Sequence, residues 1–499
     1  MIQHLRRDTA EVIATAWPLM LSTGLFSITL FVDRMLLFRY SEGSAAAAMA
    51  AGTLFWALTC FPSGLCGYTS AFVSQYLAAK RPDRALSVVW QGILLALAVG
   101  PVLIGFGFFA KSFFLVSGHP EELASQEAAY FVWLVPGAWG TVVASALVGL
   151  FAGSGRTRVL ILSDLGATVI NVVFDFLLIF GLWGFPELGA AGAAIASSMS
   201  LLFKLFVIAM FALPDLRAGF VRTRSTETGK LVCDLSHVPP GMRSPALRWE
   251  LPLMMRLVHY GWPAGVSVLA EAWSFTIIMM IVGGLGEHPA AATTLALGVN
   301  LLAFIPLVGL GIAVGVLVGK YLVHERRDIA RRMVFSGLVI GLAYSSIFVV
   351  LYGGFPDAAM TVYSLDIDPA RFDAMRPTLR PLLYFIAGYC VFDAFQTVYV
   401  GALKGAGDTF FVLFGHILAG GTTVLGGLAV SYLTGWNGLY YWWSVITFWV
   451  ILLACIFTAR YLHGGWQDKR VIEPAVIDEA LEDEEAIQDI IVVPLPSRD

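Results

Sequence analysis

Long apolar stretches separated by polar connections dominate the hydrophobic pattern of this chain. A membrane-spanning helix needs ~20 mostly apolar residues, and twelve stretches reach this length. None has the alternating ten-residue pattern of a membrane β-barrel strand. We therefore predict an all-α polytopic membrane protein with twelve transmembrane helices. The predicted helices are residues 11–38, 45–76, 86–109, 127–150, 158–181, 188–212, 256–284, 290–319, 332–353, 380–402, 409–433 and 438–461.

The composition agrees with burial in lipid. Hydrophobic residues make up 58% of the 499 positions, and charged residues 13%, against about 25% in soluble domains. A soluble chain this apolar cannot cover its own surface. The composition therefore excludes a cytosolic enzyme, a secreted disulfide scaffold and a disordered protein. No basic stripe is dense enough to predict a nucleic-acid partner.

The basic residues predict the orientation in the membrane. With a cytoplasmic N-terminus, the inner connections hold most of the 31 Lys and Arg residues. Cytoplasmic connections carry the excess of Lys and Arg, so we expect both termini in the cytoplasm and a bacterial inner membrane location. The outer connections then hold only Arg39, Lys111, Arg371, Arg376 and Arg380.

The connections divide the chain into four parts. Residues 1–212 form a predicted N-lobe of six helices, and residues 256–462 form a C-lobe of six more. Residues 213–255 are polar and proline-rich, which is typical of a cytoplasmic linker. Residues 463–499 form an acidic cytoplasmic tail. Because one chain contains both lobes, a monomer is sufficient.

The two lobes repeat one another in sequence. Pro263 follows Pro18 by 245 positions, and the same offset relates Gly309 to Gly64 and Tyr321 to Tyr76. A repeat of six helices enters the membrane twice from the same side, so the two bundles are related by a pseudo-two-fold axis along the membrane normal. Such duplication favours a carrier that opens to each side in turn.

Ionisable residues inside predicted helices mark candidate ion sites, because charge is costly in the bilayer. In the N-lobe these are Asp33 in the first helix and Asp175 in the fifth, with Asn171 one turn before Asp175 on the same face. Two carboxylates and an amide supply the oxygens that a proton or Na⁺ requires. A structural hydrogen-bond network, with Arg34 capping Asp33, is the alternative interpretation.

A second pair of acids lies in the C-lobe. Glu271 and Asp393 each lie about 20 Å deep in their helices at 1.5 Å per residue, near the midplane. We expect them to bind H⁺ or Na⁺, or else to be buried neutral acids. Gln396 and, more weakly, Gln75 are candidates for the substrate cavity. His416 is expected to be a packed histidine, and only Lys204 and Arg34 stand out as bases within the spans.

Several enzyme and ATPase motifs are missing from the sequence. Gly315 to Lys320 is one residue short of a phosphate-binding loop, and Tyr321 follows where Ser or Thr is needed. No HExxH or GxSxG motif occurs. We therefore predict a protein with no catalytic residues and no cofactor, which is not an enzyme and is driven by an ion gradient.

Four sequence blocks resemble a known family. They are Pro18 with Val32-Asp33; Val73-Ser74-Gln75; Asn171 to Asp175 with Gly189 to Gly192; and Asp393 to Gln396 with Gly401-Ala-Leu-Lys-Gly405-Ala-Gly407. Over about residues 10–462 the chain resembles the multidrug and toxic compound extrusion (MATE) family of the MOP flippase superfamily. The resemblance implies a secondary active efflux antiporter that exports organic, mostly cationic and aromatic compounds in exchange for H⁺ or Na⁺ by rocking alternating access.

The resemblance also implies roles for the acids. Asp33, Asn171 and Asp175 match the N-lobe site of the archaeal and DinF-type branch. Glu271 and Asp393 match the C-lobe cation site of the NorM-type branch. Each set is a candidate Na⁺ site. In this comparison Ser197 or Ser198 takes the place of the threonine that assists the N-lobe site.

Two other functions are alternatives for such a chain. A lipid-linked oligosaccharide flippase of the same superfamily is expected to line its cavity with several bases for pyrophosphate, whereas the deep positions here hold acids. A membrane enzyme or receptor gains no support from the duplication. The sequence therefore favours cationic cargo.

Overall fold

The computed structural model describes all residues except 1, 222, 225–230, 233–246, 365–368 and 483–499. The predicted tail and linker lie partly outside the described residues. The first half contains α1 (Ile2–Tyr40), α2 (Glu42–Gly67), α3 (Thr69–Ala78), α4 (Pro82–Val116), α5 (Glu121–Gly153), α6 (Arg158–Phe180), a short η1 (Leu182–Gly184) and α7 (Ala190–Ala218). Two-residue strands β1 (Thr223–Arg224) and β2 (Leu231–Val232) pair antiparallel in the linker.

The second half repeats this helical plan. It contains α8 (Leu251–Gly283), α9 (Glu287–Val323), α10 (Arg327–Gly354), the short α11 (Pro356–Ser364), α12 (Pro369–Ala406), α13 (Thr409–Thr434) and α14 (Leu439–His463). Among the described residues, 12 helical segments are long and apolar enough to cross a membrane, with α2 and α3 forming one of them. The twelve predicted helices and the all-α class are confirmed.

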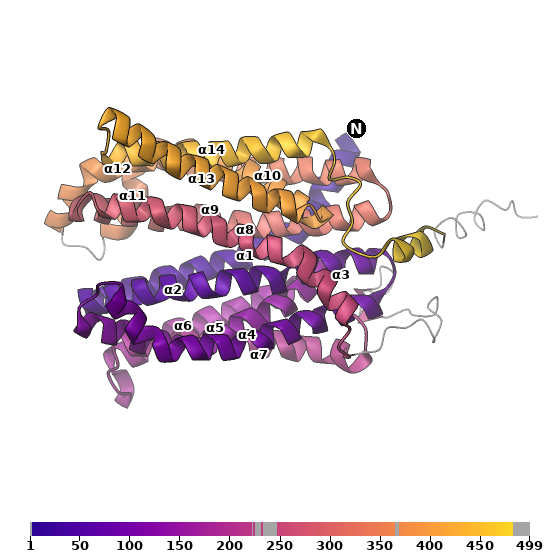
Figure 1. The fold of residues 1–499 in the computed structure, drawn as a ribbon, viewed down its shortest axis with the longest axis horizontal. Coiled ribbons are helices and arrows are strands. Elements are labelled where there is room, and N and C mark those ends of the chain that lie inside the picture. The colour runs from indigo at the N-terminus through magenta and orange to yellow at the C-terminus, as the bar shows by residue number, and fades with distance from the viewer. Residues whose placement is uncertain (1, 222, 225–230, 233–246, 365–368, 483–499) are drawn as a thin grey trace, which may run out of the picture.

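The helices form two bundles, one from each half of the chain (Figure 1). The N-terminus, the start of α8 and the helical residues 474–482 lie at one end of both bundles, on the right in Figure 1. We call this end the tail face. Glycine in the left-handed conformation ends α13 at Gly435 and α14 at Gly464, where a Cβ would be strained.

Glycines bring α9 and α12 into backbone contact inside the C-lobe. A Cβ added to Gly401 would lie 2.1 Å from the Gly311 carbonyl oxygen, and one added to Gly405 would lie 2.1 Å from that of Gly315. Helices in lipid associate through such small residues, because close backbone approach maximises dispersion contacts where no hydrophobic effect acts. The Gly-x-x-x-Gly spacing of both helices therefore determines their crossing.

The two lobes contact one another through repeat-related positions. A Cβ on Gly64 of α2 would lie 2.8 Å from the Gly265 Cα of α8, and one on Gly309 of α9 would lie 2.6 Å from the Leu19 carbonyl of α1. Gly64 and Gly309 are the repeat equivalents already noted. Nearer the tail face, Arg332 of α10 pairs with Asp8 of α1 at 3.0 Å. These contacts join the lobes in the half of the molecule next to the tail face.

We expect Gly401→Ala to destabilise the protein by about 1–3 kcal/mol, because the new methyl group overpacks a backbone contact. Gly426→Ala on α13 is the matched control, since a Cβ there meets nothing within 4 Å. Thermal unfolding in detergent measures both. Equal unfolding temperatures for the two variants would contradict the packing account.

Candidate functional site

The three predicted N-lobe residues lie together in the structure. Asp33 is on α1, and Asn171 and Asp175 are on the buried face of α6. The carboxylates of Asp33 and Asp175 are close enough for their charges to interact, and Tyr130 of α5 lies within electrostatic range of both. Asn171 donates from Nδ2 to the Ser197 hydroxyl on α7 at 3.3 Å. Helices α1, α5, α6 and α7 therefore converge on one polar cluster.

Four oxygens of this cluster are buried and accept no hydrogen bond from any residue that the structure describes. They are Oδ1 of Asp33, Oδ1 of Asn171 and both carboxylate oxygens of Asp175. Asp175 and Asn171 are fully buried, and Asp33 is 8% exposed. Burying a carboxylate without a partner costs several kcal/mol, so the charge must be neutralised by a proton or a cation. The donor set suits either, because it consists of oxygens.

The other aspartate of α6, Asp164, has the opposite environment. Asp164 pairs with Lys204 of α7 at 2.5 Å and accepts a hydrogen bond from the Ser22 hydroxyl of α1. The Lys204 ammonium is therefore paired inside the lobe. Of the Ser197 and Ser198 alternatives, only Ser197 contacts Asn171, since Ser198 donates to the Trp133 carbonyl at 2.6 Å.

The C-lobe acids also lie near one another, but Glu271 has partners. Gln396 of α12 donates from Nε2 to Glu271 Oε1 at 3.0 Å, and His416 Nε2 of α13 lies 3.5 Å from Oε2. Asp393 is 5% exposed and within electrostatic range of Glu271. The Glu271 side chain retains 30% of its exposure, so this site stays accessible from outside the bundle core.

The hydrogen bonds of His416 determine where its protons lie. Nδ1 lies 2.8 Å from the Val412 carbonyl oxygen, which only accepts, so Nδ1 carries a hydrogen. Nε2 is thus the ring nitrogen that faces the Glu271 carboxylate. His416 is buried and packs against Phe457, as expected of a packed histidine, and it also lies beside the C-lobe acid.

Lys404 was also missed as a base. It lies on α12, two turns beyond Gln396, and its charge acts on Glu271. The expectation that only Lys204 and Arg34 are bases within the spans is therefore corrected. The predicted helix ended at residue 402, so the sequence left Lys404 just outside it, and only the tertiary structure shows that its charge acts on Glu271.

An apolar cavity of about 250 Å³ lies beside the interlobe contact of Gly64. Phe26 of α1 and Phe55 and Trp56 of α2 line it, with Val268 contributed by the C-lobe. The sequence named no substrate-binding aromatic residue, because spacing does not separate cavity-lining from lipid-facing rings. The cavity has the lining expected for a flat apolar ligand.

Comparison with known proteins identifies the family. The family model MatE matches residues 18–177 and 263–426, which together cover more than half of the chain. The chain belongs to the MatE family. The two matched segments start at Pro18 and Pro263, the repeat-related prolines.

Curated relatives of this MatE protein match most of its length. It is 26% identical over 433 residues to a probable multidrug resistance protein NorM of Bacillus cereus, covering 84% of this chain and 89% of the relative. It is 28% identical over 404 residues to the multidrug resistance protein NorM of Burkholderia vietnamiensis, covering 81% and 82%.

Solved structures share the fold. The eukaryotic MATE transporter AtDTX14 superposes with a TM-score of 0.76 at 17% identity, covering 96% of this chain and 99% of that one. A structure described as the outward-facing conformation of a multidrug resistance MATE family transporter of the MOP superfamily gives a TM-score of 0.78 at 18% identity, covering 93% and 97%. The MATE fold of two six-helix lobes is therefore confirmed.

Gln75 differs from its predicted place in the cavity. It is fully buried, donates from Nε2 to the Gly405 carbonyl of α12 at 3.0 Å, and accepts from the Val471 amide at 2.9 Å. Both ends of the amide are thus occupied at the junction of the lobes. In this conformation Gln75 joins the lobes rather than lining the cavity. Gln396, by contrast, lies beside Glu271 and donates a hydrogen bond to it.

We expect opposite effects from two aspartate substitutions on α6. Asp164→Asn leaves Lys204 without its ion pair and lowers the free energy of unfolding by about 1–3 kcal/mol. Asp175→Asn removes an unpartnered buried charge and leaves the unfolding temperature unchanged or raised. Thermal unfolding in detergent compares the two variants. An equal fall in both would contradict the assignment of partnered and unpartnered acids.

Proposed function

We propose that this MatE protein is a secondary active multidrug efflux antiporter that exchanges organic, mostly cationic and aromatic compounds for H⁺ or Na⁺. The observation that carries the proposal is the cluster of buried, unpartnered oxygens at Asp33, Asn171 and Asp175. The NorM names of its relatives support multidrug export. The proposed location is the bacterial inner membrane.

Ion binding and substrate binding are alternative ways to neutralise the same carboxylates. A proton or Na⁺ at Asp33 and Asp175 removes their mutual repulsion, and so does a nearby organic cation. If both cannot be held at once, binding of either one favours release of the other. The thermodynamic link is reciprocal, and this reciprocity defines antiport.

Two ion sites enter the proposal. The N-lobe cluster has free oxygens for a proton or Na⁺, whereas Glu271 already accepts a hydrogen bond from Gln396 and lies 3.5 Å from His416 Nε2. Asp393 is the remaining carboxylate of the C-lobe site.

The substrate class follows from the cavity and the acids. Phe26, Phe55 and Trp56 offer aromatic faces that stack on flat compounds and attract cations. Among the described residues, Arg34 beside Asp33 is the base that lies in the N-lobe cluster. The acids of this cluster therefore supply a negative potential. The proposed ligand is therefore an aromatic cation.

The tail face is proposed to be the cytoplasmic face. Basic residues concentrate there, for example Arg81 and Arg84 before and in α4 and Arg326 and Arg327 at the start of α10. The named interlobe contacts also lie toward this face, so this conformation is closed to the cytoplasm. Rocking of the lobes would separate these contacts and open the tail face.

A flippase for lipid-linked oligosaccharides is the second candidate, and Lys404 is the observation that favours it. A pyrophosphate needs several free bases, and Lys204 is paired with Asp164 while the charge of Lys404 acts on Glu271. The N-lobe cluster would repel such an anion. Export of cations fits the site better.

The test uses full-length protein in liposomes that contain a fluorescent aromatic cation. A pH gradient and a Na⁺ gradient are imposed separately on wild type, Asp33→Asn, Glu271→Gln and the control Glu122→Gln, whose acid is exposed at the start of α5. We expect gradient-driven dye movement in wild type and control. We expect a fall of about tenfold or more in the variant whose lobe couples, the scale of typical coupling free energies.

Two results would contradict the proposal. Dye movement at the wild-type rate in both Asp33→Asn and Glu271→Gln would show that neither acid takes part in ion coupling. Absence of movement under either gradient, together with transfer of a lipid-linked oligosaccharide between leaflets, would favour the flippase.

A further inference from the structure

The residues that follow α14 are folded against the helices of both lobes. Residues 464–482, which we call the strap, run from Gly464 across the tail face and end in the helical residues 474–482. Trp466, Val471 and Ile472 are at most 1% exposed, and Val476 and Ala480 are also buried. The sequence predicted only an acidic tail over residues 463–499; residues 464–482 pack against the helices, and residues 483–499 lie outside the described residues.

The first part of the strap is bound to the C-lobe. Lys469 pairs with Asp408 before α13 at 2.5 Å. Arg256 of α8 donates to the carbonyl oxygens of Val471 and Ile472 at 2.5 and 2.7 Å. The strap therefore moves with the C-lobe, to which it is also covalently joined.

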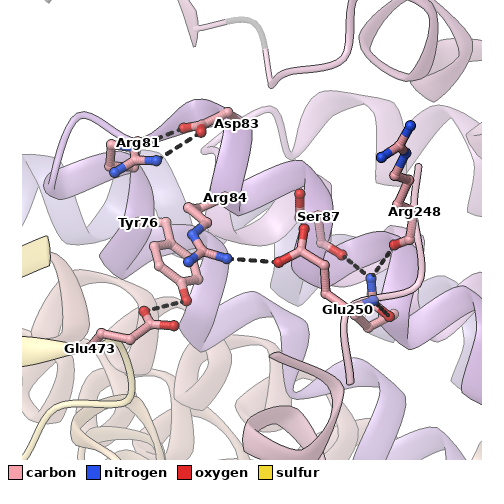
Figure 2. A network of polar contacts seen from close by, with 9 residues as sticks. Tyr76, Arg81, Asp83, Arg84, Ser87, Arg248, Glu250 and Glu473 are labelled. Atoms are coloured by element: carbon pink, nitrogen blue, oxygen red, sulfur yellow. Dashed lines mark hydrogen bonds and ion pairs between the residues drawn. The ribbon is translucent and has the colours of Figure 1, made fainter. Parts of the chain in front are cut away.

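The second part of the strap contacts the N-lobe. The hydroxyl of Tyr76 on α3 donates to the Glu473 carboxylate at 2.7 Å, as Figure 2 shows. Gln75 accepts from the Val471 amide, and Arg81 lies 3.4 Å from Glu479. These contacts cross the boundary between the lobes, because the strap belongs to one lobe and its partners to the other.

The internal repeat shows that the strap supplies a glutamate that α8 lacks at the position equivalent to Glu11 of α1. Tyr321 and Lys320 of α9 are the repeat equivalents of Tyr76 and Gln75, and they bind Glu11 of α1 at 2.6 and 3.0 Å. At the 245-residue offset, Glu11 corresponds to Arg256, which offers no acceptor. The strap supplies Glu473 instead, positioned through Arg256. Each lobe thus presents a tyrosine to a glutamate carried by the other lobe.

We propose that the strap is a releasable latch between the lobes, in which the Tyr76–Glu473 hydrogen bond holds the tail face closed. This inference rests on the proposed rocking of the lobes, because opening the tail face must separate Tyr76 from Glu473. The repeat-related hydrogen bond from Tyr321 of α9 to Glu11 of α1 also joins the two lobes near the tail face. The strap therefore adjusts the balance between the conformations without touching ion or substrate.

The test measures opening of the tail face directly. Ser74 of α3 is 3% exposed, and its hydroxyl is 3.0 Å from where a Cβ on Gly319 of the other lobe would lie. In a chain with Cys455 and Cys233 changed to Ser, Ser74→Cys places a thiol inside the closure. Alkylation by a membrane-impermeant maleimide, followed by peptide mass spectrometry, gives the rate at which this thiol becomes accessible.

Three variants are compared in this background. Tyr76→Phe and Glu473→Ala each remove one partner of the latch, and Glu482→Ala removes an exposed acid from the strap as a matched control. Alkylation of Cys390, 3% exposed within the C-lobe, reports unfolding and must stay slow throughout. We expect alkylation at position 74 to rise about threefold to tenfold in the first two variants, the effect of losing one net hydrogen bond.

The double variant makes the test specific. Because both changes remove the same hydrogen bond, Tyr76→Phe combined with Glu473→Ala is expected to match the larger single effect. Unchanged alkylation in both single variants, or additive effects in the double variant, would overturn the latch. The alkylation rate does not depend on transport. A liposome assay that shows no antiport would therefore contradict the proposed function without changing the alkylation result.

Discussion

A charge inside a bilayer requires a partner, a proton or a bound ion, and this constraint organises the interior of the protein. Asp164 meets it with Lys204 and Ser22. Glu271 is partnered by Gln396 and lies beside His416. Both carboxylate oxygens of Asp175 and Oδ1 of Asp33 have no hydrogen-bond partner among the described residues, although Arg34 lies near Asp33. In the proposed antiport these oxygens depend on an exchangeable proton or cation, through which an ion gradient would drive the protein.

The contacts between the lobes suit the rocking motion proposed for the antiporter. Close glycine contacts such as Gly64 with Gly265 give a smooth backbone surface on which two rigid bundles can rock. Polar contacts nearer the tail face, such as Glu11 with Tyr321, are discrete and either form or break. A packed but bistable interface of this kind changes between defined states rather than deforming gradually.

Much of the fold and part of the site were predictable from sequence, for physical reasons. Hydrophobic length defines spans, and the cost of buried charge made Asp33, Asp175, Glu271 and Asp393 conspicuous. Helix periodicity placed Asn171 beside Asp175 and Gln396 near Asp393. The contacts of His416, Lys404 and Gln75 were not predictable, because each depends on how one helix is rotated against another. The packing of the strap was not predictable. Its acidic composition is typical of a solvated tail, and the surface on which Val471 and Ile472 pack is formed by residues distant in the sequence.

The central claim is that ion and substrate compete for the buried carboxylates. Equilibrium binding of a fluorescent aromatic cation to purified protein, measured as the pH is lowered and separately as Na⁺ is raised, tests it most directly. The account predicts that affinity falls as at least one of these ions increases, and that replacing the responsible carboxylate removes this dependence. Affinity that is independent of both ions in wild type would contradict it.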